Sequence, residues 1–308
     1  MNVGSLSAGE LSSRLLEGTF IVKTGMFNVR VQSQIPEVSP ILALIYGDFP
    51  LASPAEFSDF QITLSRSGGL RRWFRRQVLT KIDEIPLYMP LPASHAFPAF
   101  EWGLNQCIAL AVKDSLIIHA AVIEKNGLAA ILPAPPGSGK STLCAALVNR
   151  GWRLLSDELA IVEVSTGAVI PLPRPVSLKN ASIDIIQAYA PEAVFSPKVF
   201  GTSKGTIGHM KPPTSSVMRA AQSARPAWII FPKYVPDAKA ELTAMSKATG
   251  FMNVIANSFN YGSLGLAGFK TAGDLIDRCA CYDFSYSKLD DAIKVFSLLE
   301  QEREPSDD

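Results

Sequence analysis

The sequence predicts an α/β protein of the mixed α+β kind, and three stretches of the chain carry this prediction. Apolar and polar side chains alternate at residues 25–32 and 57–64, within the first 105 residues. Such alternation is typical of half-buried strands. Residues 115–150 read as strand, turn, strand, glycine-rich loop and helix, and residues 290–299 have the spacing of an amphipathic helix. We therefore expect a smaller, mostly β N-terminal region followed by a larger region that combines helices with a sheet.

The N-terminal region should contain strands whose apolar side chains share one face. These side chains are Phe27, Val29 and Val31 in the first segment, and Phe60, Ile62 and Leu64 in the second. The proline-rich stretch at 85–100 predicts an extended connector, and residues 99–112 predict an apolar helix that leads into the second region.

The second region begins with a predicted hairpin, in which residues 125–127 turn between strands at 115–124 and 128–133. A helix is expected at 140–150, ended by Gly151. Further strands are expected at 153–155, 159–164, 168–172 and 228–231. The expected domains are residues 1–105, for acceptor recognition or assembly, residues 106–300, and a disordered tail at 301–308.

Composition excludes several classes of protein. The chain carries 29 Lys+Arg against 28 Asp+Glu, which argues against nucleic-acid binding through net charge. Four scattered cysteines predict reduced, structural thiols. The uncharged stretch at 248–269 holds three Asn and four Gly, so we expect a buried or loop-rich segment without a membrane span. The N-terminus has no secretory signal pattern. We expect a soluble, cytoplasmic protein.

Residues 134–142, Ala-Pro-Pro-Gly-Ser-Gly-Lys-Ser-Thr, fit the phosphate-binding P-loop pattern with Ala at the first, usually glycine, position. Small residues let backbone amides converge on phosphate oxygens at a helix N-terminus. Lys140 can reach the β- and γ-phosphates, and the Ser141 hydroxyl can join a Mg²⁺ shell. The candidate nucleotide-binding residues are Pro136, Gly137, Ser138, Gly139, Lys140, Ser141 and Thr142.

Two acids follow an apolar strand downstream of this loop, at Asp157 and Glu158. One carboxylate can hold Mg²⁺ while the other accepts the proton of an attacking hydroxyl, and the sequence alone does not decide between them. A solvated turn is the alternative. His119 lies on the apolar strand before the loop and is either a core residue or part of the site.

Residues 117–163 taken together resemble the catalytic domain of the HPr kinase/phosphorylase family, in the order of His-bearing strand, hairpin, P-loop, helix and acid pair. The whole chain looks like the HPr-kinase-related kinase A group, and kinases of lasso-peptide precursors are similar in the same core. The resemblance implies a phosphoenolpyruvate-carboxykinase-like nucleotide domain. It also implies that His119 is an active-site residue, Asp157 the catalytic carboxylate and Glu158 a metal partner. Thr142 stands where the family has an acid, so the resemblance does not extend to the reverse reaction or to HPr as substrate.

The expected activity is ATP- and Mg²⁺-dependent transfer of a phosphoryl group to a hydroxyl, with Lys140, Asp157 and His119 as catalytic residues and Ser141, Asp157 and Glu158 at the metal. The expected partner is a protein or peptide that offers a serine, and a homo-oligomer is left open. Two alternatives stay open: a nucleotide-binding regulatory module without transfer activity, and a kinase for a small molecule.

Three further groups of polar residues have an open role. A basic cluster between residues 59 and 83 is either an anion-binding patch or a solvated hairpin: Arg66, Arg71, Arg72, Arg75, Arg76 and Lys81. A second group, Arg174, Lys179 and Asn180, could hold phosphates. The third, Lys204, His209 and Lys211, falls in a Gly/Pro-rich stretch that reads as a mobile loop, either a lid or an ordinary surface loop.

Overall fold

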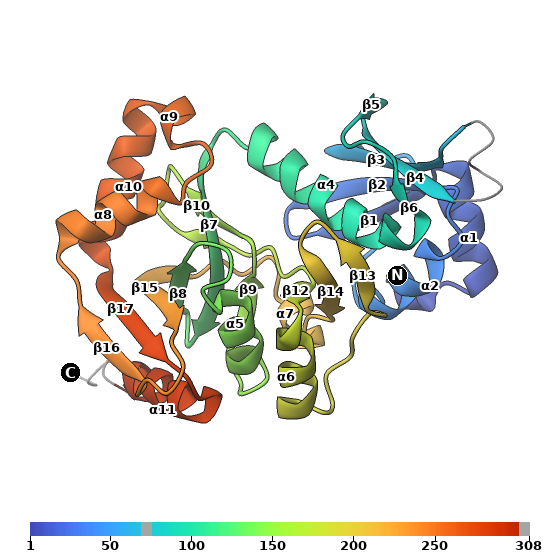
Figure 1. Ribbon diagram of the computed structural model, residues 1–308. Helices are drawn as coiled ribbons and strands as arrows, with labels where there is room; N and C mark the ends of the chain where they lie inside the picture. The colour runs from blue at the N-terminus through green and yellow to red at the C-terminus, as the bar shows by residue number, and fades with distance from the viewer. Residues whose placement is uncertain (69–75, 302–308) are drawn as a thin grey trace. The chain divides into compact units, whose positions relative to one another are not determined.

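The computed structural model describes residues 1–68 and 76–301 and shows a mixed α+β chain, as the sequence predicts (Figure 1). The chain forms two compact units. The first unit comprises Met1–Ala111, Pro173–Ile185 and Glu192–Ala221, and the second comprises Val112–Leu172, Ile186–Pro191 and Gln222–Asp308. Each unit thus combines segments that are distant in sequence. The three expected domains, residues 1–105, residues 106–300 and a disordered tail at 301–308, stay a prediction, and residues 302–308 lie outside the described residues.

The first unit contains a sheet with strand order β1-β2-β3-β4-β5, in which β6 also pairs with β4. Its strands are β1 (Phe20–Thr24), β2 (Phe27–Ser33), β3 (Phe60–Arg66), β4 (Gln77–Ile82), β5 (Ile85–Pro86) and β6 (Leu91–Pro92). Its helical segments are η1 (Val3–Ser5), α1 (Ala8–Glu17), α2 (Val38–Ile45), η2 (Ala93–His95) and α4 (Ala96–Ala111). Burial alternates strictly along β2, which confirms the predicted strand face.

The basic cluster is only partly within the described residues, because Arg71, Arg72 and Arg75 fall in the segment 69–75 that the structure does not describe. Arg76 lies 3.9 Å from a carboxylate oxygen of Glu37, and Lys81 lies 3.0 Å from one of Glu84. These two cations are therefore paired with acids of the same unit, as the solvated-hairpin interpretation expects.

A three-stranded sheet with order β12-β14-β13 also belongs to the first unit. Its strands are β12 (Val176–Lys179), β13 (Val199–Thr202) and β14 (Gly205–Met210), and the helix α7 (Thr214–Met218) follows. The prediction of a mobile loop around Lys204, His209 and Lys211 is therefore wrong. Gly205, with φ +86, turns the chain tightly between β13 and β14. His209 is 1% exposed and packs edge-on against Phe97.

The second unit contains a mixed sheet with order β11-β10-β7-β8-β15-β17-β16, and β9 also pairs with β7. Its strands are β7 (Ser115–Lys125), β8 (Leu128–Pro133), β9 (Arg153–Ser156), β10 (Leu159–Glu163), β11 (Val169–Ile170), β15 (Arg225–Tyr234), β16 (Glu241–Ala244) and β17 (Ala280–Tyr286). Its helices are α5 (Lys140–Val148), α8 (Lys247–Ala256), α9 (Tyr261–Leu264), α10 (Leu266–Arg278) and α11 (Leu289–Gln301), while α6 (Ala181–Tyr189) begins in the first unit and ends in the second.

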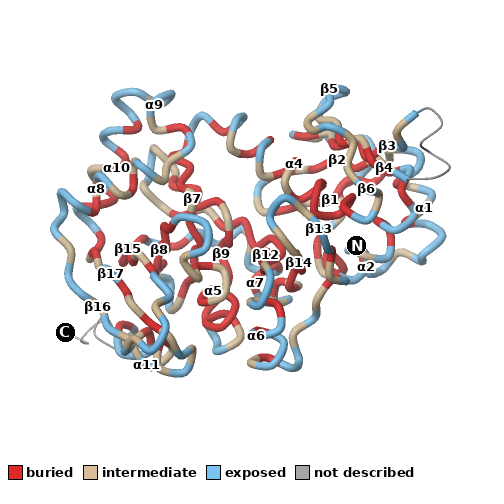
Figure 2. Tube along the Cα trace, viewed as in Figure 1, coloured by how far each residue is buried: buried red, intermediate tan, exposed pale blue. Residues whose placement is uncertain are grey.

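The hairpin β7–β8 is confirmed, and its turn has the geometry that its residues favour. Asn126 and Gly127 have φ of +52 and +79, as a two-residue hairpin turn with positive φ requires. The strands β7, β8 and β9 are largely buried, as the red tube in Figure 2 shows. Because these strands form the core of the unit, the side chains at their ends are held on a rigid frame.

The uncharged stretch at 248–269 is mostly helical apart from residues 257–260, and most of its residues are not buried, so the expectation of a buried or loop-rich segment is wrong. Its glycines allow close packing: a Cβ on Gly250 would lie 3.0 Å from the Cys281 sulfur, and one on Gly268 would lie 2.8 Å from the Tyr261 carbonyl oxygen. Within residues 1–68 and 76–301, no helix has the length and apolar character needed to cross a membrane.

Candidate functional site

The glycine-rich loop joins the end of β8 to the start of α5, which is the strand–loop–helix context that phosphate binding requires. Gly137 and Gly139 have φ of +88 and +90, a conformation that costs glycine little. Gly139 is the N-cap of α5 and offers no side chain to the amides of the first turn. These amides and the helix dipole therefore favour an anion at this position.

Two tyrosines from distant strands support the loop. The Tyr286 hydroxyl donates to the Gly139 carbonyl at 2.9 Å, and the Tyr234 amide donates to the Ser138 carbonyl at 2.8 Å. Burial raises the pKa of Tyr286 well above its ordinary value, so the hydroxyl keeps its proton and remains a donor. Sequence reasoning missed both residues because they follow Gly139 by 95 and 147 positions and carry no motif.

The acid pair reaches the loop through the pairing of β7. Strands β9 and β10 lie along the same edge of β7, with Ser156 opposite Val122 and Leu159 opposite His119. Asp157 and Glu158 join these two strands, so they face the middle of β7. The other edge of β7 pairs with β8, which leads into the glycine-rich loop. The sheet therefore brings the acids, His119 and the loop together, although 38 positions separate His119 from Asp157.

His119 stands between a cation and an acid. Its Nε2 atom lies 3.0 Å from the Lys140 Nζ atom and 3.2 Å from a carboxylate oxygen of Glu158. The Lys140 ammonium can only donate, so His119 accepts from it when the ring proton sits on Nδ1. A proton on Nε2 turns the same atom into a donor to Glu158. The position of one proton therefore decides which neighbour His119 binds.

Lys140 and Asp157 are nearly inaccessible, at 6% and 3% exposure, whereas the side chains of His119 and Glu158 are 22% and 24% exposed. Burial raises the pKa of the Cys144 thiol, the negative Asp157 raises it further, and the positive Lys140 lowers it. The charges of Asp157 and Lys140 thus act in opposite directions on the same thiol in α5.

The residues present fit a nucleotide phosphate and Mg²⁺. Ser138 Oγ is buried and has no hydrogen-bond partner among the described residues, and a Cβ on Gly137 would meet no atom within 4 Å. A phosphate oxygen would supply the partner for Ser138 and fill the open space over Gly137. In the described part of the chain, no three His, Cys, Asp or Glu form a complete metal cage. Mg²⁺ needs only one or two carboxylates when water and phosphates supply its other ligands.

The second group of predicted phosphate-binding residues, Arg174, Lys179 and Asn180, lies in the first unit, where Arg174 and Asn180 have partners. The Arg174 guanidinium is buried, and it donates to a Glu101 carboxylate oxygen at 2.5 Å and to the Asn105 side-chain oxygen at 2.6 Å. Asn180 accepts the Thr206 amide at 3.0 Å, within the β12–β14 region. These contacts support structural roles for Arg174 and Asn180.

Sequence reasoning also missed the neighbours of His119 that come from the C-terminal half. The His119 amide donates to the Asn257 carbonyl at 2.7 Å, and the Phe259 ring lies 5.9 Å from the imidazole between ring centroids. Phe259 is 55% exposed, so this ring borders the open side of His119. No spacing in the sequence links residues 119 and 259.

No protein-family model matches the chain, and no curated protein matches it. Among solved structures, the HPr(Ser) kinase/phosphatase from Coxiella burnetii is similar, with 12% sequence identity and a TM-score of 0.28, over 61% of this chain and 95% of that chain. A TM-score this low supports no conclusion about a shared fold. The resemblance of residues 117–163 to the HPr kinase family, and the carboxykinase-like fold that it implies, therefore stay predictions.

Proposed function

We propose that this protein is a kinase that transfers the γ-phosphoryl group of ATP, with Mg²⁺, to a hydroxyl group, most simply a serine of a protein or peptide. The observation that carries the proposal is the cluster of Lys140, His119 and Glu158 beside a glycine-rich loop that opens a helix. Phosphoryl transfer depends mainly on positioning and on neutralising charge, and this cluster offers a cation, an imidazole and a carboxylate at the phosphate end of the loop.

Each residue has a distinct role in the proposal. The amides at the start of α5 hold the phosphates, and Lys140 binds the β/γ end. Ser141 and Glu158 hold Mg²⁺, which offsets phosphate charge when it is bound. Asp157 orients the acceptor hydroxyl and takes its proton. His119 contacts both Lys140 and Glu158 through Nε2, and the ring nitrogen that carries the proton decides whether it accepts from the first or donates to the second.

The buried Asp157 argues for transfer rather than for nucleotide sensing. Asp157 is 3% exposed. A sensor that only binds the nucleotide has no need for a buried proton acceptor next to its phosphate site. An acid at this position supports a reaction in which a proton must be removed.

The test is transfer of label from γ-labelled ATP with Mg²⁺ to an extract of the source organism. We expect a labelled protein with the wild type, and transfer reduced by roughly 10²–10⁴-fold in Asp157→Asn, the range for loss of a general base. Asp274→Asn, which changes an exposed acid on α10, is the matched control and should transfer as the wild type does. Label confined to a small, acid-soluble product would instead identify a small-molecule kinase. Tight ATP binding with no transfer at all would support the regulatory module.

A further inference from the structure

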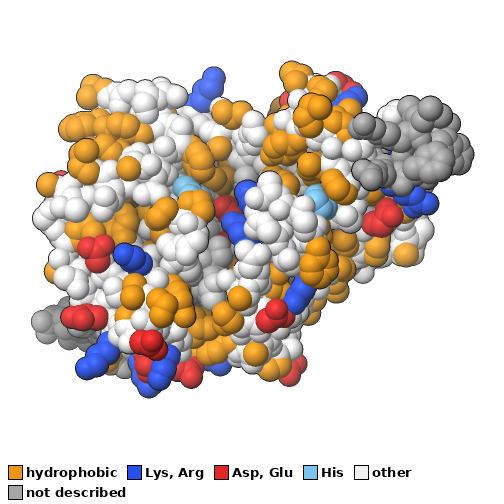
Figure 3. Space-filling view, in the orientation of Figure 1, with side chains coloured by type: hydrophobic (Ala, Val, Ile, Leu, Met, Phe, Trp, Pro, Cys, Tyr) orange, Lys and Arg blue, Asp and Glu red, His pale blue; other side chains and the backbone are white. Residues whose placement is uncertain are grey.

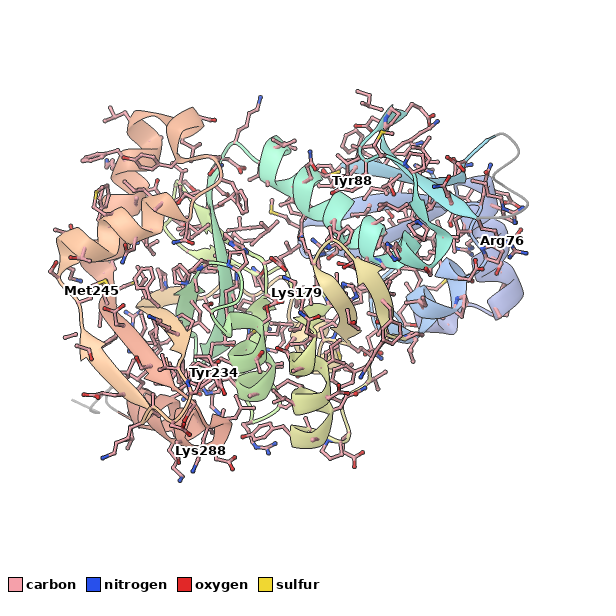
Figure 4. The ribbon with its side chains drawn as sticks, viewed as in Figure 1. Arg76, Tyr88, Lys179, Tyr234, Met245 and Lys288 are labelled. Carbon is pink, nitrogen blue, oxygen red and sulfur yellow. The ribbon has the colours of Figure 1, made fainter. Side chains whose placement is uncertain are left out.

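A second surface borders the glycine-rich loop on the side away from His119. We call it the Tyr234 rim and define it as residues 234–238, which begin at the last residue of strand β15 (Figure 4 labels Tyr234). Its backbone is tied to its neighbours at three points. Tyr234 donates to the Ser138 carbonyl, Val235 donates to the Tyr286 carbonyl at 2.9 Å, and Ser287 donates to the Ala238 carbonyl at 2.7 Å. The rim is therefore a fixed wall of the loop.

The order of strands places His119 and Tyr234 on opposite sides of the loop. His119 lies on β7, the loop follows β8, and Tyr234 ends β15, in the sheet order β7-β8-β15. A Cβ on Gly139 would lie 3.1 Å from the Tyr234 Cβ, so the tyrosine lies directly against the last glycine of the loop. A nucleotide whose terminal phosphate is held near Lys140 and His119 would therefore extend its ribose and base toward Tyr234.

The Tyr234 ring has the form of a stacking surface. It is 51% exposed although it belongs to a strand of the central sheet. Its ring meets the buried Tyr286 ring at a centroid distance of 6.0 Å and an angle of 77°. An edge-to-face contact of this kind orients the outer ring and leaves a ring face available. Tyr286 in turn donates to Gly139, so one pair of tyrosines links the base side of the site to the loop.

We propose that Tyr234 stacks on the base of the bound nucleotide. The inference rests on the proposed function, because it needs the phosphates to lie on the loop. Stacking on an aromatic ring recognises the flat face of a base and not its edge, so the ligand class is a purine nucleoside triphosphate with little discrimination between adenine and guanine. Acidic and basic side chains are interspersed on the face that the space-filling view draws (Figure 3).

The test compares a ligand that has a base with one that has none. The dissociation constants of Mg·ATP and Mg·tripolyphosphate are measured by calorimetry for the wild type, Tyr234→Ala and Tyr234→Phe. Tyr234→Ala should weaken ATP binding by roughly 5- to 100-fold, the range for loss of one base–aromatic stack. The dissociation constant of tripolyphosphate should change by no more than about twofold. Tyr234→Phe should bind both ligands as the wild type does. Phe269→Ala, which removes a ring of similar exposure (56%) on α10, is the matched control.

A second measurement does not depend on how the alanine variant folds. The triphosphate of the fluorescent base 2-aminopurine should be quenched when it binds the wild type, because stacking quenches this base. Bound but unquenched 2-aminopurine would overturn the inference, as would equal wild-type affinities for ATP and tripolyphosphate. If Tyr234→Ala weakened the binding of ATP and of tripolyphosphate by the same factor, the inference would also be overturned, since that result indicates damage to the loop. If the wild type binds neither ligand, the proposed function itself fails, and the inference fails with it.

Discussion

Replacing either glycine of the loop by alanine separates backbone strain from crowding. Gly137 and Gly139 have nearly the same φ, +88 and +90. Alanine in this region costs about 1–2 kcal/mol, so both variants share that loss. Their surroundings differ, because a Cβ on Gly137 meets no atom within 4 Å, whereas one on Gly139 lies 2.5 Å from the Tyr286 hydroxyl oxygen. Crowding of this kind adds about 1–3 kcal/mol.

The expected loss is therefore about 1–2 kcal/mol for Gly137→Ala and about 2–5 kcal/mol for Gly139→Ala, measured as the free energy of unfolding in urea. Tyr286→Phe removes the crowding oxygen and, alone, should cost about 0.5–1.5 kcal/mol for its hydrogen bond to Gly139. In the Tyr286→Phe background, Gly139→Ala should cost about 1–2 kcal/mol less than in the wild type. Equal losses for the two glycine variants, or strict additivity in the double variant, would refute the reasoning.

Three further predictions concern stability. Glu124→Gln leaves the buried Arg153 without its carboxylate partner; the side chains of Glu124 and Arg153 are 2% and 5% exposed. This variant should lower the free energy of unfolding by about 3–5 kcal/mol. A loss below about 1 kcal/mol would contradict the buried ion pair. Asn260→Ala removes the side chain that accepts from the Ile117 amide and donates to the Val112 and Ser115 carbonyls, at and just before the start of β7. It should lower the free energy of unfolding by about 1–3 kcal/mol in the same urea assay. No loss would mean that these hydrogen bonds are not formed. The pKa of Asp48 lies below its ordinary value of 3.8, because hydrogen bonds and the Lys211 charge outweigh the opposing effect of burial. Asp48 thus stabilises the folded state above pH 3.8, and this stabilisation is lost as the pH falls through its lowered pKa. Asp48→Asn should therefore lower the free energy of unfolding at pH 6 and change it little at pH 2. A loss that does not depend on pH would count against the ion pair.

Local patterns along the chain predicted much of the fold. The alternation at Phe27, Val29 and Val31 marks a strand with one buried face, and the Asn126-Gly127 turn marks a hairpin, because both signals are short-range. The helix after Lys140 was expected for the same reason. Residues 248–269 were misread because glycine and asparagine usually break helices, while here Gly250 lets α8 approach β17 and Gly268 lets α10 approach α9.

The candidate site was predictable only where it carries a motif. Lys140 and the acid pair lie near each other in sequence, and the pairing of β9 and β10 with β7 explains how they reach His119. Tyr234 and Tyr286 could not be found from the sequence, because their role depends on the parallel pairing of β15 with β8 and β17. Such pairings are set by tertiary packing and leave no local signal.

Binding of Mg·ATP to the loop tests the central claim most directly. Calorimetry on the wild type, Lys140→Met and Lys270→Met compares the buried lysine of the site with an exposed lysine on α10. We expect the wild type and Lys270→Met to bind with the same affinity, and Lys140→Met to bind at least about tenfold more weakly, since it loses one charge-assisted contact to phosphate. Equal binding by all three proteins, or no binding by the wild type, would contradict a nucleotide site at residues 134–142.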